Sequence, residues 1–320
     1  MHHTNGKGRP VSSRLAIAKA FIAKMVYNCS NTRVLIDHIT QSPSLRRLCG
    51  WETRSAIPSE STFSRAFDAF ATGELPQKIH ESMIESCYNP KLAGHISRDS
   101  SAIDAREKAT PKPKEESKES SVPKKRGRPK KDEKRDPKPP RRLALQPDRS
   151  LKENIADLPC DCDYGGKKNS NGHKYKWKGY KLHVDVVDGD IPVCAVLTSA
   201  SVHDSQVSIP LAQMSDQRVT NLYDLMDATY DAPEIYEFSR RLGHVPIIDD
   251  NPRRSGVKKM MNTAQSIRYR ERSSVERFFS NLENYGSKHI RVRGHAKVMA
   301  HLMFGVIVVA ATQILNLLPS

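Results

Sequence analysis

The sequence predicts an α/β protein in which a mixed sheet with helices on its faces follows a small all-helical region. Three observations lead to this fold class. Apolar residues recur at helical spacing through residues 14–71, whereas short alternating apolar segments take turns with helical ones from residue 180 onward. Between the two parts, residues 108–142 hold 15 Lys and Arg, seven Pro and no aromatic residue. Such a composition cannot bury enough apolar surface to fold, so a disordered insert divides the chain.

Residues 1–92 are predicted to form a small helical domain that binds DNA. Four stretches carry apolar residues at helical spacing: 14–27, 31–39, 42–51 and 57–71. The last of them places Phe63, Phe67 and Phe70 along one face. Arginines on the exposed sides fit a small DNA-binding bundle, and they fit a plain interaction module equally well. The pattern alone does not predict a helix-turn-helix.

The insert is strongly basic and indicates a polyanionic partner. Residues 108–142 carry a net charge of +9, which is more than half of the +16 of the whole chain. A charge of this sign and size favours nucleic acid. We expect the disordered insert to extend over residues 108–150 of a second domain that spans residues 93–320.

Within the insert, the stretch KKRGRPKK matches the core of an AT-hook. Arg126 and Arg128 flank Gly127 and can lie flat in a narrow A·T minor groove, where the negative potential is strongest. The alternative is a solvated basic linker that makes non-specific phosphate contacts. Under both interpretations Arg126 and Arg128 are candidate DNA-binding residues.

The second domain is predicted to contain five strands with helices between them. Strands are expected at 94–103, 180–187, 191–200, 219–227 and 244–249, and helices at 204–214, 232–243, 267–283 and 299–318. Asp188 and Gly189 form a tight-turn signal, which makes a hairpin of the second and third strands. His301, Gln313 and Asn316 interrupt the apolar last helix, which favours a buried core helix over a membrane span. No membrane partner is expected.

The helix at 267–283 places a glutamate beside its buried face. The apolar side of this helix consists of Val275, Phe278, Phe279 and Leu282, and a second stripe consists of Tyr269, Arg272, Glu276 and Glu283. Glu276 therefore lies near the edge of the buried face, where it is partly shielded and rigidly held. Taken alone, Arg272 and Glu276 would be an ordinary i, i+4 ion pair worth roughly 0.2–0.5 kcal/mol.

Three acidic residues stand where the predicted sheet can bring them together. Asp99 lies in the first strand, Asp227 ends the fourth, and Glu276 lies on the late helix. If the first and fourth strands are neighbours, Asp99 and Asp227 lie side by side at the carboxyl ends of strands, where ligands gather. Clustered carboxylates repel unless a hard cation neutralises them, so two Mg²⁺ or Mn²⁺ ions are the expected cofactors. Asp104 is the alternative first ligand, and Asp204 is expected to cap the following helix.

These motifs, taken in order, resemble the DDE-type insertion-sequence transposases. RDSSAI resembles the strand of the family's first aspartate, with Ser101 in place of Thr, and MDATYDAPEI resembles the D-x-x-Y-[DS] motif of the second. YRERSSVE fits Y-x2-R-x3-E, although Glu283 stands where the family often has Lys. IPSESTFSRAF resembles the helical amino-terminal domain of the same family.

The resemblance implies a ribonuclease-H-like catalytic domain with a mixed five-stranded sheet and flanking helices. It makes Asp99, Asp227 and Glu276 the catalytic metal ligands, and it makes Tyr269 and Arg272 contacts to the DNA backbone. The implied reaction is two-metal phosphoryl transfer that cuts insertion-sequence ends and joins them to target DNA.

The resemblance also implies the partners and the place of action. The partners are the terminal inverted repeats and the target, both double-stranded DNA, bound by a homodimer in the prokaryotic cytoplasm at the nucleoid. Two other functions stay open, namely a catalytically inactive DNA-binding or regulatory protein and a nuclease without joining activity.

Overall fold

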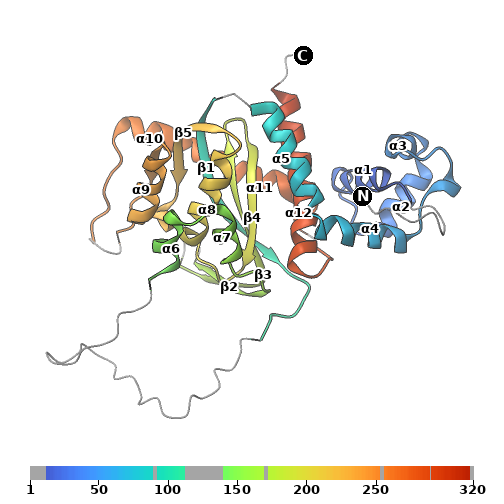
Figure 1. The fold of residues 1–320 in the computed structure, drawn as a ribbon, viewed down its shortest axis with the longest axis horizontal. Helices are drawn as coiled ribbons and strands as arrows, with labels where there is room; N and C mark the ends of the chain where they lie inside the picture. Colours follow the sequence, from blue (N-terminus) through green and yellow to red (C-terminus); the bar gives the residue numbers. More distant parts are fainter. Residues whose placement is uncertain are drawn as a thin grey trace, which may run out of the picture.

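The computed structural model describes residues 12–88, 92–111, 140–168, 172–252, 256–288 and 290–317. Within these ranges the chain forms an N-terminal helical bundle and a sheet with helices on both faces (Figure 1). The strands are β1 (Leu92–Asp104), β2 (Asp163–Lys168), β3 (Lys174–Val187), β4 (Ile191–Ser199), β5 (Thr220–Met226) and β6 (Val245–Ile248).

The helical elements surround this sheet and build the bundle. The α-helices are α1 (Arg14–Val26), α2 (Thr32–Gln41), α3 (Pro43–Cys49), α4 (Glu60–Thr72), α5 (Leu75–Tyr88), α6 (Arg142–Leu145), α7 (Leu151–Ala156), α8 (Ser205–Asp216), α9 (Pro233–Arg241), α10 (Thr263–Tyr269), α11 (Ser273–Leu282) and α12 (His295–Asn316). Short 3₁₀ turns are η1 (Arg54–Ala56), η2 (Gln146–Asp148), η3 (Ala228–Tyr230) and η4 (Arg270–Arg272), and η5 (Glu283–Ser287) is π-helical.

The strand order places β1 at the centre of a mixed sheet. β1 pairs antiparallel with β3 and parallel with β5, β4 pairs antiparallel with the other side of β3, and β6 pairs parallel with β5. The resulting order β4-β3-β1-β5-β6 is that of a ribonuclease-H-like fold, which confirms the predicted fold class. All five predicted strands are present, and β2, which pairs with the start of β3, is an additional strand.

Apolar side chains of β3 and β4 point alternately to the two faces of the sheet, and both faces are buried. Leu182 and Val184 of β3 and Leu197 of β4 pack with residues of α11 and α12, whereas Cys194 and Val196 of β4 pack with residues of α8. Successive side chains of a strand point to opposite faces, so one hairpin supplies two cores. The sheet is therefore held between α8 and α9 on one face and α11 and α12 on the other (Figure 1).

Helix α12 joins the N-terminal bundle to the sheet. Ala300 and Phe304 pack in the core of α1 to α4, where Phe21 stacks on Phe304 with ring centroids 5.6 Å apart. Val298 and Leu302 of the same helix pack in the core beneath the sheet. The helix is long and apolar enough to cross a membrane by length and composition, but most of it is buried inside the protein. Its burial matches the predicted core helix.

Residues 142–148, which the sequence assigns to the disordered insert, form helical structure. Residues 112–139 lie outside the described residues, and so do Arg126 and Arg128. The expected disordered end at residue 150 is wrong, because α6 and η2 occupy residues 142–148. Leu143 packs against the core of β5, β6 and α9, and the buried Gln146 amide donates to the Gln206 carbonyl at 2.6 Å. These two contacts stabilise a segment that the sequence predicted to be disordered.

Two buried histidines are expected to make the protein less stable in mild acid. Burial, with help from the nearby charges of Arg218 and Lys24, lowers the pKa values of His80 and His301 to about 4, from an ordinary value of 6.5. Below pH 6.5 the unfolded chain therefore takes up protons that the folded protein excludes. The free energy of unfolding should fall by up to about 1.4 kcal/mol per pH unit for each histidine between pH 6.5 and about 4.

Urea unfolding at several pH values tests this expectation. The ring of His80 lies 2.9 Å from the Pro192 carbonyl through Nε2, so His80→Gln keeps a donor but cannot titrate. We expect His80→Gln to flatten the acid decline, and His203→Gln at an exposed position to leave it unchanged. If the free energy of unfolding falls equally with pH in the parent and in both variants, His80 is not a cause of the acid destabilisation.

Candidate active site

Two neighbouring strands bring two of the predicted carboxylates to the same edge of the sheet. β1 and β5 run parallel, and the last pair in their register is Ser97 with Leu225. Asp99 and Asp227 each follow two residues later, so they stand side by side where β5 ends. Asp99 is still part of β1, and Asp227 begins the turn η3.

Arg272 links the first predicted carboxylate to the third. Its guanidinium donates to Asp99 Oδ2 at 3.1 Å and to Glu276 Oε1 at 2.5 Å. The side chains of Arg272 and Asp99 are each 18% exposed, whereas that of Glu276 is 59% exposed. The i, i+4 pair that the sequence suggests is therefore present, but a strand aspartate from a distant part of the chain completes it.

The helical segment that carries Arg272 and Glu276 is tied to β1. It consists of α10, η4 and α11 in succession, in place of the single helix predicted. Ser97 Oγ donates to the Glu271 carbonyl at 3.1 Å, which fixes η4 against the strand. Val275 and Phe278 of α11 are fully buried, as their spacing predicts. Glu276, which was expected to be partly shielded at the edge of this face, is instead exposed.

The acidic groups influence one another electrostatically. The pKa of Asp99 is raised above its ordinary value, mainly because the carboxyl is buried and further because the Asp227 carboxylate lies near it. The N–H of Ser100, which donates to Asp99 Oδ1 at 2.7 Å, and the guanidinium of Arg272 oppose this rise. A divalent cation at this place would relieve the repulsion.

Tyr269 also belongs to this group of charges. Burial raises its pKa to about 12, and the carboxylates of Asp249, Asp227 and Asp99 add to the effect. Its ring centroid lies 5.9 Å from the guanidinium of Arg272. The phenol is therefore neutral at physiological pH and can donate a hydrogen bond, which suits the predicted contact to a DNA phosphate.

The remaining sequence candidates lie apart from this group. Asp104 is exposed and is in register with Gly179 at the far end of β1, so Asp99 is the one of the two that lies beside Arg272. Glu283, which stands where the related family often has Lys, is exposed and pairs with Lys288 at 2.6 Å.

The donor set fits a hard divalent cation in its chemistry, although the oxygens are not gathered around one point. Carboxylates are the ligands that Mg²⁺ and Mn²⁺ prefer. In the ranges given above, no three His, Cys, Asp or Glu side chains lie close enough together to hold a metal ion. Arg272 lies between Asp99 and Glu276, and Asp227 accepts from the N–H of Thr229 at 2.8 Å and from the Thr229 hydroxyl. The carboxylates would therefore have to turn toward a cation.

Asp204 supports the site from the opposite face of β1, in a role that the sequence did not indicate. It stands at the N-cap of α8, but its side chain makes no capping bond, so the predicted capping role is wrong. Its Oδ1 instead accepts from Ser100 Oγ at 2.9 Å and from Lys181 Nζ at 2.9 Å. Ser100 follows Asp99 directly, so Asp204 holds the strand at the predicted ligand. Only the long-range pairing of β1 with β3 brings Lys181 to this place.

Asp204→Asn is expected to lower the metal affinity of the proposed site without abolishing metal binding. The amide keeps the shape of the side chain but leaves Lys181 without its negative partner, and that lysine is only 13% exposed. Loss of such a supporting residue commonly costs about 10–100-fold in metal affinity or activity. We expect a higher Mg²⁺ concentration for half-maximal DNA nicking. Asp216→Asn, at the exposed other end of α8, is the control and should behave as the parent.

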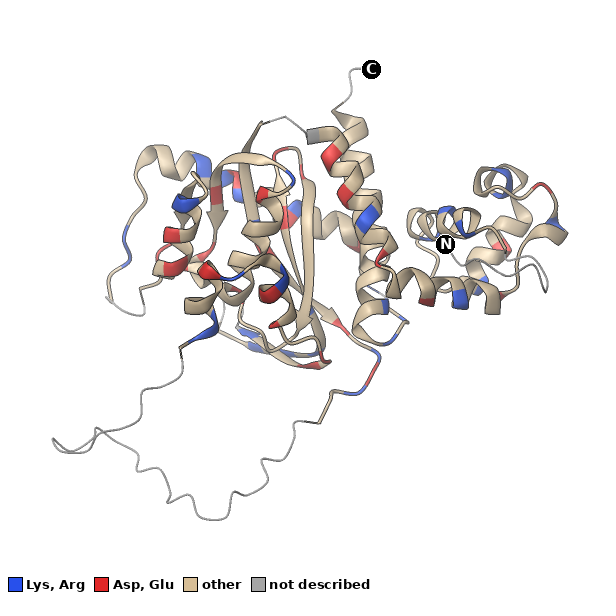
Figure 2. Cartoon of the chain, in the orientation of Figure 1, with Lys and Arg blue, Asp and Glu red and all other residues tan. Residues whose placement is uncertain are grey.

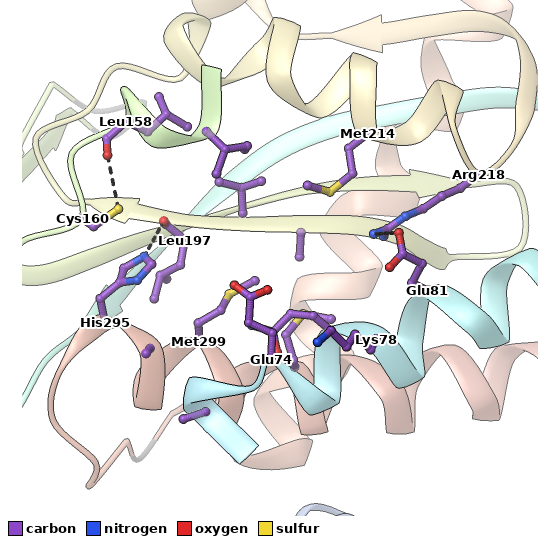
Figure 3. Close-up of a pocket in the computed structure, with 17 residues that line it drawn as sticks. Glu74, Lys78, Glu81, Leu158, Cys160, Leu197, Met214, Arg218, His295 and Met299 are labelled. Atoms are coloured by element: carbon purple, nitrogen blue, oxygen red, sulfur yellow. Dashed lines mark hydrogen bonds and ion pairs between the residues drawn. The ribbon is translucent and has the colours of Figure 1, made fainter. Parts of the chain in front are cut away.

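A separate cavity lies at the outer edge of β4 and has no part in this site (Figure 3). It has a volume of about 350 Å³ and lies between β4, α5, α12 and the α7–α8 side of the protein. Arg218 and Glu81 pair across it at 3.0 Å, and His295 lies 2.8 Å from the Leu197 carbonyl. None of Asp99, Asp227 and Glu276 lines it.

Comparison with known families gives two matches, which together cover most of the chain. A family model described as a transposase DDE domain matches residues 102–310, and one described as a transposase domain (DUF772) matches residues 1–69. The first match covers well over half of the chain, includes Asp227 and Glu276, and begins three residues after Asp99. No curated protein matches the chain.

Proposed function

Because the chain belongs to the DDE transposase family, whose members are generally metal-dependent phosphoryl transferases, we propose that it cuts the ends of an insertion sequence and joins them to target DNA. The observation that carries the proposal is the meeting of Asp99, Arg272 and Glu276, with Asp227 directly after the adjacent strand β5. Three segments far apart in the sequence supply these four residues. A structural ion pair alone would not require the third carboxylate nearby.

Each residue has a distinct task in this proposal. Asp99, Asp227 and Glu276 would hold Mg²⁺ or Mn²⁺, and the chemistry such ions supply when bound is activation of a nucleophile and neutralisation of charge on a leaving oxygen. Arg272 offers a bidentate fork to a DNA phosphate beside the ions. Tyr269 donates its hydroxyl to the same backbone. The order of events, cleavage followed by attack of a freed 3′-hydroxyl, is taken from the resemblance to the family.

The N-terminal bundle and the insert are the proposed DNA-binding parts. Lys19 of α1, Arg47 of α3 and Arg65 of α4 are exposed, and Figure 2 shows Lys and Arg on these helices. Arg126 and Arg128, in the insert, are proposed to enter an A·T minor groove. We further propose that the protein acts as a homodimer on DNA at the nucleoid of a prokaryotic cell.

A cleavage and joining assay tests the proposed function. The substrate is duplex DNA that flanks the coding sequence on both sides, since the element's ends should lie there. We expect nicks at defined positions only when Mg²⁺ or Mn²⁺ is present, followed by joining of the 3′ ends to a second DNA. Nicking without joining would support a nuclease, and DNA binding without nicking would support a regulatory protein.

A further inference from the structure

Arg272 occupies the position in the site where a positive charge is needed. One guanidinium contacts Asp99 at 3.1 Å and Glu276 at 2.5 Å, and the other oxygen of Asp99 accepts the N–H of Ser100 at 2.7 Å. Both oxygens of Asp99 are therefore engaged by donors of this chain. An arginine side chain is charged throughout the physiological pH range, so a positive charge lies between these two carboxylates.

We propose that Arg272 and a divalent cation exclude each other at these carboxylates, and that a DNA phosphate which draws Arg272 away couples DNA binding to metal binding. The inference rests on the proposed function, since it takes Asp99 and Glu276 as metal ligands and DNA as the partner. It adds a regulation of the same site that the proposed function does not require.

Electrostatics gives the reason for exclusion. A dication bound to Asp99 and Glu276 would lie within a few ångströms of the guanidinium that now contacts both, and like charges at that separation repel strongly where water is scarce. The side chains of Arg272 and Asp99 are only 18% exposed, so water screens them incompletely. Either the arginine or the metal can therefore neutralise these carboxylates, but the presence of both cations at the same carboxylates is unfavourable.

DNA gives Arg272 a second partner and so favours the metal. A phosphate can accept both guanidinium nitrogens, which here donate singly to Asp99 and Glu276. The side chain of Glu276 is 59% exposed, so the site opens to the surface. Phosphate and metal then both favour the state in which Arg272 has left the carboxylates. Two ligands that favour one state bind with positive coupling, and each raises the affinity of the other by the same factor.

The test measures the coupling from both sides with Ca²⁺ and a short duplex that carries the sequence flanking the gene. Ca²⁺ takes the same oxygen ligands. Calorimetry gives the Ca²⁺ affinity without DNA, and duplex affinity is measured across Ca²⁺ concentrations at constant ionic strength. For Arg272→Gln we expect Ca²⁺ to bind about fivefold or more tightly than to the parent, and the Ca²⁺ dependence of duplex binding to be lost.

Arg277→Gln is the matched control. Arg277 lies five residues further along, on α11, and pairs with Asp190 away from the three carboxylates. Its substitution removes the same charge. Its Ca²⁺ affinity and its coupling should equal those of the parent. If Arg272→Gln binds Ca²⁺ no more tightly than the parent does, the proposed exclusion is overturned.

Two further results keep the test decisive. If Arg272→Gln does not fold, Arg272→Lys replaces it, because an ammonium keeps the charge but lacks the fork. A weaker Ca²⁺ dependence of duplex binding in Arg272→Lys supports the inference, and an unchanged dependence overturns it.

Nicking with Mg²⁺ is measured separately. A parent that shows the coupling but never nicks would refute the proposed function alone, whereas nicking without the coupling would refute this inference alone.

Discussion

Glu276→Gln is expected to slow metal-dependent DNA cleavage by about a hundredfold or more while DNA binding is retained. Glutamine keeps the shape of the side chain and an oxygen for Arg272, but it removes a negative charge that a divalent cation needs. A bound metal contributes several kcal/mol to the stabilisation of the transition state, and each 1.36 kcal/mol lost is a factor of about ten in rate. Asp227→Asn should have the same effect for the same reason.

Glu283→Gln provides the control for this substitution. Glu283 lies seven residues further along the same helical run, is exposed, and pairs only with Lys288 among the contacts described for it. Its cleavage rate should stay close to that of the parent. The measurements are the nicking rate in Mg²⁺ and the duplex affinity in Ca²⁺. Equal and mild losses in Glu276→Gln and Glu283→Gln would leave Arg272 and Glu276 as a surface ion pair and nothing more.

The backbone positions of the candidate site could be predicted because they depend on strand order alone. Asp99 and Asp227 were expected to be neighbours if the first and fourth strands paired, and β1 and β5 do pair in parallel. Apolar periodicity predicted which face of α11 is buried, although Glu276 beside that face is more exposed than expected. The buried face of α11 follows from a local pattern, whereas the meeting of Asp99 and Asp227 depended on a strand pairing that the sequence analysis had to assume.

The side-chain contacts could not be predicted, because they join residues that are distant in the sequence. Arg272 was expected to face DNA, but its bond to Asp99 spans 173 positions of the chain. Asp204 was expected to cap α8 with its side chain. Its carboxylate instead accepts hydrogen bonds from Ser100 of β1 and Lys181 of β3. The end of the insert was misplaced because the disorder predicted for residues 108–142 was extended to residue 150. Leu143 and Gln146 are held by contacts with distant parts of the chain, which the local sequence does not indicate.

A second large effect is expected from the ion pair that lies beneath Asp99. Arg98 precedes it on β1 and donates through Nε and Nη2 to both oxygens of Asp185 on β3, at 2.7 and 2.6 Å. The two side chains are 2% and 0% exposed. Ser208 accepts from Arg98 at 3.0 Å, and Ser215 donates to Asp185 at 2.7 Å, so α8 is joined to the same pair.

Arg98→Met is therefore expected to lower the free energy of unfolding by about 3–5 kcal/mol, because it leaves the buried Asp185 carboxylate without a positive charge beside it and with Ser215 as its remaining donor among the contacts given above. Arg277→Met is the matched comparison, since Arg277 grips Asp190 with the same two-bond geometry, at 2.8 and 2.7 Å, but is 52% exposed. The loss of unfolding free energy in Arg277→Met should be under about 1 kcal/mol.

Arg98→Met combined with Asp185→Leu removes both charges and should recover most of the stability, since an apolar pair of similar volume often replaces a buried ion pair without loss. Urea unfolding of all four proteins measures these differences. A small loss in Arg98→Met, or no recovery in the double variant, would mean that the pair is not what fixes β1, and with it Asp99, against β3 and α8.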